Sequence, residues 1–472
     1  MPRLPTIDTR QASAKPRTLV LCFDGTTNIY DNTNTNVVKL FSLLKRDNRE
    51  EQMVYYQPGV GTYVPPGILL PITLQLAKIA DQAIALYLDK HVMGGYEFLM
   101  KHYNDGDKIC LFGFSRGAYT ARALAGMLHK VGLLPPDNVE QISFAYQMYK
   151  RSDKVGFKES AGFKRTFSRE VEIEFVGVWD TVSSVRLLIP RHLPFTKSNP
   201  IVKTFRHAVS LDERRAKFRH HLWHVHSSGG QCSGKEGDGM ITEASGTKPR
   251  LLDRIINRLG GRPTKTRSAD SSGAFEYEAA MSAEFQTNTW ENDVLEVWFA
   301  GCHGDVGGGA VKDTEEYQLS NISLRWMIRQ IISSQCGIKF NAGALKAMHV
   351  SPATVSFGIK APSSRYSSPS DVKLVSAAQE QEMGDALADV HDNVLKPAWW
   401  PLELIPLLHT TIDRKGDSHI RVRPNLFKGR RPHTSNEKIK IHRTVQYRIN
   451  NSGLNKYEYK ARITEENIEW VD

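Results

Sequence analysis

The sequence predicts an α/β protein with a mostly parallel central sheet and helices on both faces of that sheet. Short apolar runs suited to buried strands alternate with stretches of helical periodicity, which favours parallel strands joined by helices. Most of these apolar runs end in polar or glycine-rich turns, and in open α/β sheets the functional site lies at the carboxyl ends of the strands. We therefore expect one sheet with its functional residues along a single edge.

The predicted elements follow one another in a regular order. A helix is expected over 33–46, with Thr35 or Asn36 as its N-cap, and a long one over about 70–102. A third helix is expected over 118–134, directly after a strand. The predicted strands are RTLVLCFDG (17–25), QMVYYQPGVG (52–61), DKICLFGFSRG (107–117), VEIEFVGVWDTV (171–182) and DVLEVWFAGCHGDVGG (293–308).

A large insertion is expected before the last core strand, at about 183–290. Its first part, HAVSLDERRAKFRHHLW (207–223), is expected to be helical and packed. The Ser/Gly-rich part, over about 227–290, has too little apolar content to bury and is expected to be disordered. The predicted division of the chain is a flexible tail (1–16), an α/β catalytic domain that contains the insertion (17–330) and a basic C-terminal extension packed on the core (331–472).

The chain carries a formal net charge of +11, and the excess is concentrated near the C-terminus. Residues 411–450 hold 11 Lys and Arg against 3 Asp and Glu. Such a stretch suits an anionic partner, for which we expect a membrane surface rather than nucleic acid. A solvated basic face is the commoner interpretation of such a stretch. The sequence does not indicate an oligomeric state.

The cysteines and the apolar stretches predict a cytoplasmic protein. Five scattered cysteines form no CxxC pair, and Cys22 and Cys110 lie in apolar runs, as buried thiols do. The N-terminus lacks the apolar segment of a signal peptide. The longest apolar stretch, 64–88, is interrupted by Lys78 and Asp81, so we expect a packed helix and no transmembrane helix.

A candidate nucleophile stands in GFSRG, where Gly113 and Gly117 flank Ser115. The pentapeptide alone is weak, but an apolar strand precedes it and a small-residue helix follows it. This strand–turn–helix setting is typical of a nucleophile elbow, in which glycines permit a strained turn. A serine that only caps the helix is the structural alternative. The setting favours Ser115 as the nucleophile of an α/β-hydrolase-like fold.

A catalytic serine needs a base and an acid, which follow it in the order Ser, acid, His in this fold. Asp180 ends the fourth predicted strand and His303 follows the fifth, so they are the expected acid and base. Asp305 is a rival acid, although we expect it to shape the glycine turn.

The oxyanion hole is expected to use the backbone N–H of Arg116, the residue after the nucleophile. A second N–H is expected from the turn after the first strand, at Gly25 or Thr26. Asp24, in the same turn, is expected to shape the site.

Other chemistries fit these residues less well. LCFDGTT resembles the nucleophile strand of haloacid-dehalogenase-type phosphatases, but Cys22 stands where their first aspartate is required. The glycine loop after the fifth strand lacks the Lys-Ser/Thr of a phosphate loop. A site for a hard cation would require Asp24, Asp180, His303 and Asp305 to bind one ion together. We expect neither a metal nor a cofactor.

Several motifs occur in a characteristic order: FDGTTN, GFSRGAYTARALAG, VWDTV, HAVSLDERR and CHGDVGGG. With them the chain resembles the uncharacterised α/β hydrolases grouped with the catalytic domain of type VI secretion phospholipase effectors, as a stand-alone, fungal-type member. The resemblance covers about 17–330, and WWPLELIPL and KIKIHRTV extend it to about 445. It implies that Ser115, Asp180 and His303 form the catalytic triad.

The sequence thus predicts a serine hydrolase of the lipase or phospholipase kind, acting on a small-molecule or lipid carboxyl ester. KPAWWPLELIPLL (396–408) offers an apolar surface beside the basic stretch, and the pair would suit a lipid interface. The alternative is a non-catalytic α/β module that binds anionic partners through 411–450.

Overall fold

A computed structural model provides the structure of the chain. The residues it describes are 16–25, 31–59, 73–182, 193–223, 271–285, 290–350, 369–404, 407–412, 418–432, 438–451, 453, 457–463 and 465–472. The predicted N-terminal tail lies outside these residues, except for Pro16.

The core is one eight-stranded sheet whose strands all run parallel, in the order β10-β9-β6-β5-β4-β3-β1-β2. Its strands are β1 (Thr18–Phe23), β2 (Gln52–Gln57), β3 (Lys108–Phe114), β4 (Ile173–Trp179), β5 (Val202–Ser210), β6 (Asp293–Phe299), β9 (Ile439–His442) and β10 (Ile468–Val471). A separate antiparallel pair is formed by β7 (Leu407–Ile412) and β8 (Ser418–Arg423). The predicted α/β fold with a mostly parallel sheet is confirmed.

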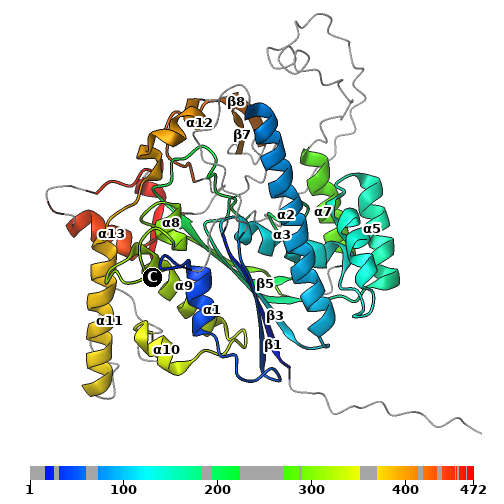
Figure 1. The fold of residues 1–472 in the computed structure, drawn as a ribbon, viewed down its shortest axis with the longest axis horizontal. Helices are drawn as coiled ribbons and strands as arrows, with labels where there is room; N and C mark the ends of the chain where they lie inside the picture. Colours follow the sequence, from blue (N-terminus) through cyan, green and yellow to red (C-terminus); the bar gives the residue numbers. More distant parts are fainter. Residues whose placement is uncertain are drawn as a thin grey trace, which may run out of the picture.

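Helices cover both faces of this sheet (Figure 1). They are α1 (Asn36–Leu43), α2 (Thr73–His102), α3 (Arg116–Val131), α4 (Ile142–Lys150), α5 (Lys154–Phe167), α7 (Ser271–Phe285), α8 (His303–Gly307), α9 (Leu319–Ser334), α10 (Ala342–Ala347), α11 (Pro369–Leu387), α12 (Trp400–Leu404) and α13 (Arg443–Asn451), with short 3-10 turns at Val139–Gln141, Asn393–Leu395, Pro397–Trp399 and Glu465–Asn467. Thr35 is the N-cap of α1, and its side chain accepts a hydrogen bond from Val38 N–H, as predicted. Among the described residues, no helix has both the length and the apolar character needed to cross a membrane.

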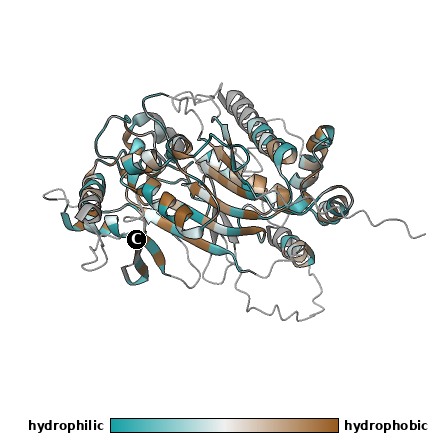
Figure 2. Cartoon of the chain, turned by 90° about the horizontal axis from the view of Figure 1, so that it is seen from below, coloured by the Kyte–Doolittle hydropathy of each residue, from teal (hydrophilic) through white to brown (hydrophobic). Residues whose placement is uncertain are grey.

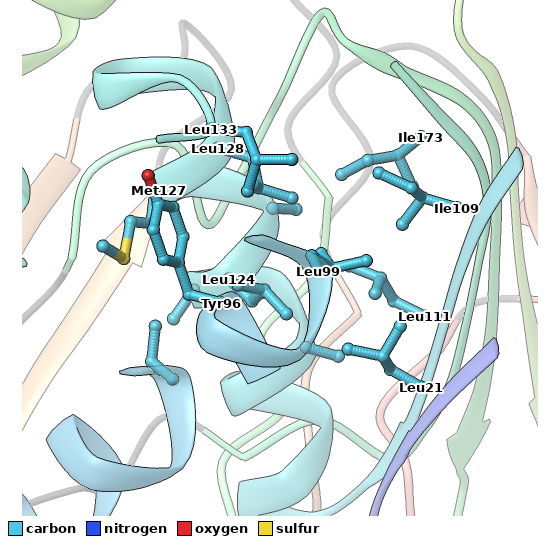
Figure 3. Close-up of a cluster of buried hydrophobic side chains, with 14 of the residues drawn as sticks. Leu21, Tyr96, Leu99, Ile109, Leu111, Leu124, Met127, Leu128, Leu133 and Ile173 are labelled. Carbon is cyan, nitrogen blue, oxygen red and sulfur yellow. The ribbon is translucent and has the colours of Figure 1, made fainter. Parts of the chain in front are cut away.

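Both faces of the sheet are buried, which explains why its strands are apolar throughout. Leu19 and Leu21 of β1 pack in the cluster formed with α2 and α3, while Val20 and Cys22 pack on the opposite face with α1 and α9. Figure 3 shows the first of these clusters, where Leu124 of α3 and Leu99 of α2 meet the strands. In Figure 2 the hydrophobic residues recur along the strands between the outer helices. The cysteines among the described residues, Cys22, Cys110, Cys302 and Cys336, are buried and free.

The segment predicted to be helical over 207–223 begins instead inside strand β5. This prediction was wrong because polar residues disguise the strand. Arg206 donates to Gln330 and to Asp293, and His207 contacts Glu296 at 2.7 Å. Partners remote in sequence thus satisfy side chains that local periodicity assigns to a helix surface.

The end of the segment predicted to be disordered is also ordered, since 271–285 forms helix α7. Tyr277, Met281 and Phe285 recur every four residues and therefore share one face of the helix. That face packs on Phe157 of α5 and on Phe195. Three large side chains suffice to dock a helix in an otherwise polar stretch. Residues 224–270 lie outside the described part of the chain.

The C-terminal part of the chain adds strands β9 and β10 to the sheet. Trp298 of β6 pairs with Ile441 of β9, and β9 pairs with β10. The short strand KIKIH did not stand out in a basic stretch, yet Ile439 and Ile441 are buried in the core.

Candidate active site

The candidate residues gather at one edge of the sheet, where the chain changes direction. Strand β1 lies between β2 and β3, so the chain continues in opposite directions along the sheet after β1 and after β3, and open α/β sheets bind ligands at such switch points. Asp24, Ser115 and Asp180 come directly after β1, β3 and β4, and His303 opens α8 just beyond β6. Phe114 and Trp179 are register partners, which places the next residues, Ser115 and Asp180, side by side.

Ser115 occupies a sharp, strained turn, with φ 59° and ψ −120°. A Cβ on Gly113 would lie 2.4 Å from the carbonyl oxygen of Gly117, and one on Gly117 would lie 2.2 Å from that of Phe23. Only glycine permits such close backbone approach. The N–H of Ser115 donates to the carbonyl of Trp179 at 3.0 Å, which ties the turn to β4. This is the geometry of a nucleophile elbow.

His303 and Asp180 form a buried pair beside this turn. Nδ1 of His303 lies 2.6 Å from Oδ2 of Asp180, whose own backbone is strained at φ 37°. The imidazole lies between two aromatic rings, with centroid distances of 4.6 Å to Phe114 and 4.8 Å to Phe218. Because Phe114 immediately precedes Ser115, the histidine lies next to the elbow. An ionised carboxylate only accepts, so the contact places the proton on Nδ1 and leaves Nε2 as the acceptor.

Burial and neighbouring charges favour a neutral base beside an ionised acid. Burial lowers the pKa of His303, although Asp180 opposes this effect. Burial alone would raise the pKa of Asp180, but Arg430 and His303 hold it below its usual value. The histidine is therefore able to accept a proton at neutral pH, as a general base must.

Asp305 has a different role from Asp180. Its Oδ2 accepts from the N–H of Cys302 at 2.9 Å and so caps α8, while its Oδ1 lies 2.8 Å from Nδ1 of His391. Gly301, just before this cap, adopts φ 102°, which a residue with a side chain rarely adopts. The structure therefore pairs His303 with Asp180 and pairs Asp305 with His391.

The structure also bears on the expected oxyanion hole. Arg116 is the first residue of α3, and N–H groups in a first helical turn lack partners within the helix. The N–H of Gly25 donates to Oδ1 of Asp24 at 2.6 Å, so it already has a hydrogen-bond partner within the turn. Asp24 also accepts from the hydroxyls of Thr35 and Tyr56, at 2.7 and 2.8 Å. Thr26 lies outside the described residues.

Arg430 is a member of the site that the sequence did not reveal. Its guanidinium donates to both carboxylate oxygens of Asp180, with Nη2 2.9 Å from Oδ2. The two residues are 250 positions apart, and Arg430 lies in the basic stretch where many arginines look alike. No local sequence pattern distinguishes Arg430 from the other arginines of this stretch.

Glu213 holds the backbone of His303, and Arg215 in turn holds Glu213. The N–H of His303 donates to Oε2 of Glu213 at 3.3 Å, and Arg215 forms an ion pair with Glu213 at 2.7 Å. The Arg215 guanidinium lies 3.5 Å from the centroid of the Phe218 ring. Glu213 and Arg215 belong to the motif HAVSLDERR. The family motif therefore pointed to this part of the site, whereas hydrophobic periodicity wrongly predicted a helix there.

The carboxylates at this edge do not converge on one point, since Asp24, Asp180 and Asp305 each have separate partners. Within the part of the chain that the structure describes, no three His, Cys, Asp or Glu side chains are grouped as metal ligands would be.

The fold and this edge define an α/β-hydrolase-like protein. The chain matches the family described as "T6SS, Phospholipase effector Tle1-like, catalytic domain" over residues 17–330, and it belongs to that family. Membership supports a hydrolase in general.

The proteins similar to this chain include a curated relative and two solved structures. The relative is "Uncharacterized protein YEL023C" of Saccharomyces cerevisiae, 28% identical over 555 aligned positions that cover 94% of this chain and 80% of the relative. An uncharacterized protein from Pseudomonas aeruginosa is 18% identical with a TM-score of 0.36, over 83% of this chain and 53% of its own length. The Tle1 effector bound to the VgrG spike of the type 6 secretion system is 12% identical with a TM-score of 0.36, covering 81% of this chain and 82% of the effector.

Proposed function

We propose that the protein is a serine hydrolase that cleaves a lipid carboxyl ester through an acyl-enzyme on Ser115. The observation that carries the proposal is the buried contact between His303 and Asp180 next to the strained turn of Ser115. Strained backbone conformations cluster at active sites, where the strain is part of the mechanism.

The chemistry follows from these positions. Nε2 of His303 takes the hydroxyl proton as Oγ of Ser115 attacks the ester carbonyl, and Asp180 stabilises the imidazolium that forms. The N–H of Arg116 donates to the developing oxyanion. The imidazolium then returns the proton to the leaving alkoxide, which departs as the alcohol. Water, deprotonated by the same histidine, hydrolyses the acyl-enzyme and releases the carboxylic acid.

An exposed apolar surface supports a lipid substrate. We call it the apolar rim, and its exposed fractions are 68% for Leu395, 48% for Trp400, 60% for Leu404 and 45% for Leu426. Trp399, which precedes Trp400 of the rim, packs edge-on against Phe218 beside His303, at 5.6 Å between ring centroids. An apolar surface beside a catalytic site is suited to a lipid surface.

The charges within the rim segments, 393–404 and 424–432, favour an anionic lipid. Their exposed charged residues are Lys396, Lys428 and Arg431. Glu403, the acid of these segments, is buried and accepts from Asn425 at 2.6 Å. The rim therefore combines apolar side chains with positive charge, as anionic membrane surfaces favour.

A module that only binds anions through 411–450 is less well supported. Arg430 donates to Asp180, Arg448 donates to the carbonyls of Ala386 and Ala388, and Arg443 pairs with Asp472 at 3.3 Å. Part of the positive charge is thus neutralised or occupied inside the molecule.

A fluorophosphonate probe tests the nucleophile. We expect stoichiometric labelling of the wild type, none of Ser115→Ala, and unchanged labelling of Ser42→Ala, whose serine is exposed on α1. A wild type that is not labelled, or a Ser115→Ala variant labelled like it, contradicts the proposed mechanism.

Vesicles test the lipid substrate. The double variant Trp400→Ser, Leu404→Ser should hydrolyse anionic phospholipid vesicles about tenfold more slowly, with turnover of a soluble short-chain ester unchanged. Val155→Ser, which removes an exposed apolar side chain from α5, is the control and should change neither. Equal loss on both substrates would mean that the rim does not bind lipid.

A further inference from the structure

We propose that Arg430 is a positioning residue of the active site, which holds the Asp180 carboxylate and sets the pH range in which His303 acts as a base. This inference rests on the proposed serine hydrolase mechanism. Arg430 lies 100 residues beyond the end of the family match at residue 330, so the match does not include it. The site is therefore completed by the C-terminal extension.

Every nitrogen of the guanidinium is engaged around Asp180. Nη1 donates to Oδ1 of Asp180, and to Oγ and the carbonyl oxygen of Ser210 at 2.8 and 3.2 Å. Nη2 donates to Oδ2 of Asp180 and to the carbonyl of Phe218, and Nε donates to the same carbonyl at 3.2 Å. Arg430 is only 7% exposed. A planar fork of this kind fixes the plane of a carboxylate, which a lysine cannot do.

Fixing the carboxylate orients the histidine. Oδ1 of Asp180 is held by the N–H and the hydroxyl of Ser210, at 3.0 and 3.1 Å, in addition to Arg430. Oδ2 is shared between Arg430 and Nδ1 of His303. With both oxygens held, the direction in which Asp180 accepts from His303 is set, and so is the direction of Nε2.

The backbone around Arg430 is itself anchored. Its carbonyl accepts from the N–H of Arg462 at 2.9 Å. Asn425 and Phe427, a few residues before Arg430, are held as well. The side chain of Asn425 and the N–H of Phe427 donate to the Glu403 carboxylate, at 2.6 and 3.1 Å. The guanidinium is thus presented by a backbone that is held at Phe427 and at Arg430 itself, as a positioning role requires.

The charges around the pair determine the sign of the electrostatic effect. Besides Arg430, the groups that face His303 or Asp180 are Arg215, Glu213 and His207. Burial lowers the pKa of His207, whose Nε2 accepts from Thr181 N–H. The negative charges of Asp180 and Glu213 are balanced by the positive charges of Arg215 and Arg430. Removal of the Arg430 charge leaves an excess of negative charge, which stabilises imidazolium and raises the pKa of His303.

The test measures the labelling rate with a fluorophosphonate as a function of pH. For Arg430→Gln we expect a loss of about 10²-fold at neutral pH and an acidic limb that moves upward by about one pH unit. Arg430→Lys keeps the charge without the fork, so its rate falls but its acidic limb stays near that of the wild type. Arg448→Gln is the matched control, because it removes another buried arginine of the extension and should leave the limb unmoved.

NMR titration of the His303 ring, assigned with His303→Gln, separates this inference from the proposed function. A higher pKa of His303 in Arg430→Gln supports the inference, and an unchanged pKa and limb overturn it. A wild type without labelling overturns the serine hydrolase, while the titration still decides whether Arg430 acts on the pair. Should Arg430→Gln fail to fold, a wild-type labelling rate in Arg430→Lys would overturn the role of the fork.

Discussion

Two histidine–aspartate pairs meet at the short helix α8, and their surroundings give them opposite character. His303, the first residue of α8, contacts Asp180 at 2.6 Å, and Asp305, in the same helix, contacts His391 at 2.8 Å. The His303 side chain is 8% exposed, whereas that of His391 is 39% exposed. The contact distances alone would not separate the two pairs.

The difference shows that burial, more than the contact itself, decides which histidine can act as a base. Burial is the largest influence on His303, and it lowers the pKa in spite of Asp180. The hydrogen bond to Asp305 is the largest influence on His391, and it raises the pKa. A histidine of raised pKa holds its proton at neutral pH, so His391 is suited to an ion pair and His303 to accepting a proton.

The largest expected effect separates the two histidines. His303→Ala should slow fluorophosphonate labelling by about 10⁵–10⁶-fold, because it removes the base that the serine needs. His391→Ala should slow labelling less than about threefold, since its ring faces Asp305 and not the serine. Rate constants for the two variants under identical conditions check this, and similar losses would contradict the assignment of His303.

The two aspartates should differ in labelling rate in the same way as the two histidines, but by a smaller factor. Asp180→Asn should lose about 10⁴-fold, because an amide no longer holds the proton on Nδ1 of His303. Asp305→Asn should retain activity within about tenfold but lose about 1–2 kcal/mol of unfolding free energy, since Asp305 caps α8 and holds His391. Labelling rates and urea unfolding are the measurements. Greater loss of activity in the Asp305 variant would make Asp305 the orienting acid.

The smallest effect is a pH dependence of stability with opposite signs. The pKa of His391 is raised on folding, so its stabilisation is complete below the unfolded value of about 6.5 and fades as the pH rises through the folded value. The pKa of His303 is lowered, so its burial costs stability as the pH falls below about 6.5. We expect His391→Gln to lower Tm by about 1 °C at pH 5.5 and not at pH 9. Thermal unfolding at these two pH values checks this. A loss of Tm that is larger at pH 9 than at pH 5.5 would contradict the expected sign.

Much of the fold could be predicted from local pattern. Strands such as β1 and β3 are buried on both faces, so they read as unbroken apolar runs. The strained turn at Ser115 was visible because glycine is required on both sides of it. Strand β5 was missed because the polar side chains of Arg206 and His207 find partners in other elements, such as Gln330 and Glu296, that no local pattern shows.

By itself the sequence determined which side chains end the central strands, because strand ends and glycine turns are local properties. From these positions it predicted Ser115, Asp180 and His303 as the catalytic residues, with Asp305 as a rival acid. Only the tertiary structure decided which aspartate faces which histidine and that Arg430 holds Asp180. The physical reason is that burial and ion pairing depend on groups brought together across 250 residues of chain, and no local pattern records those contacts.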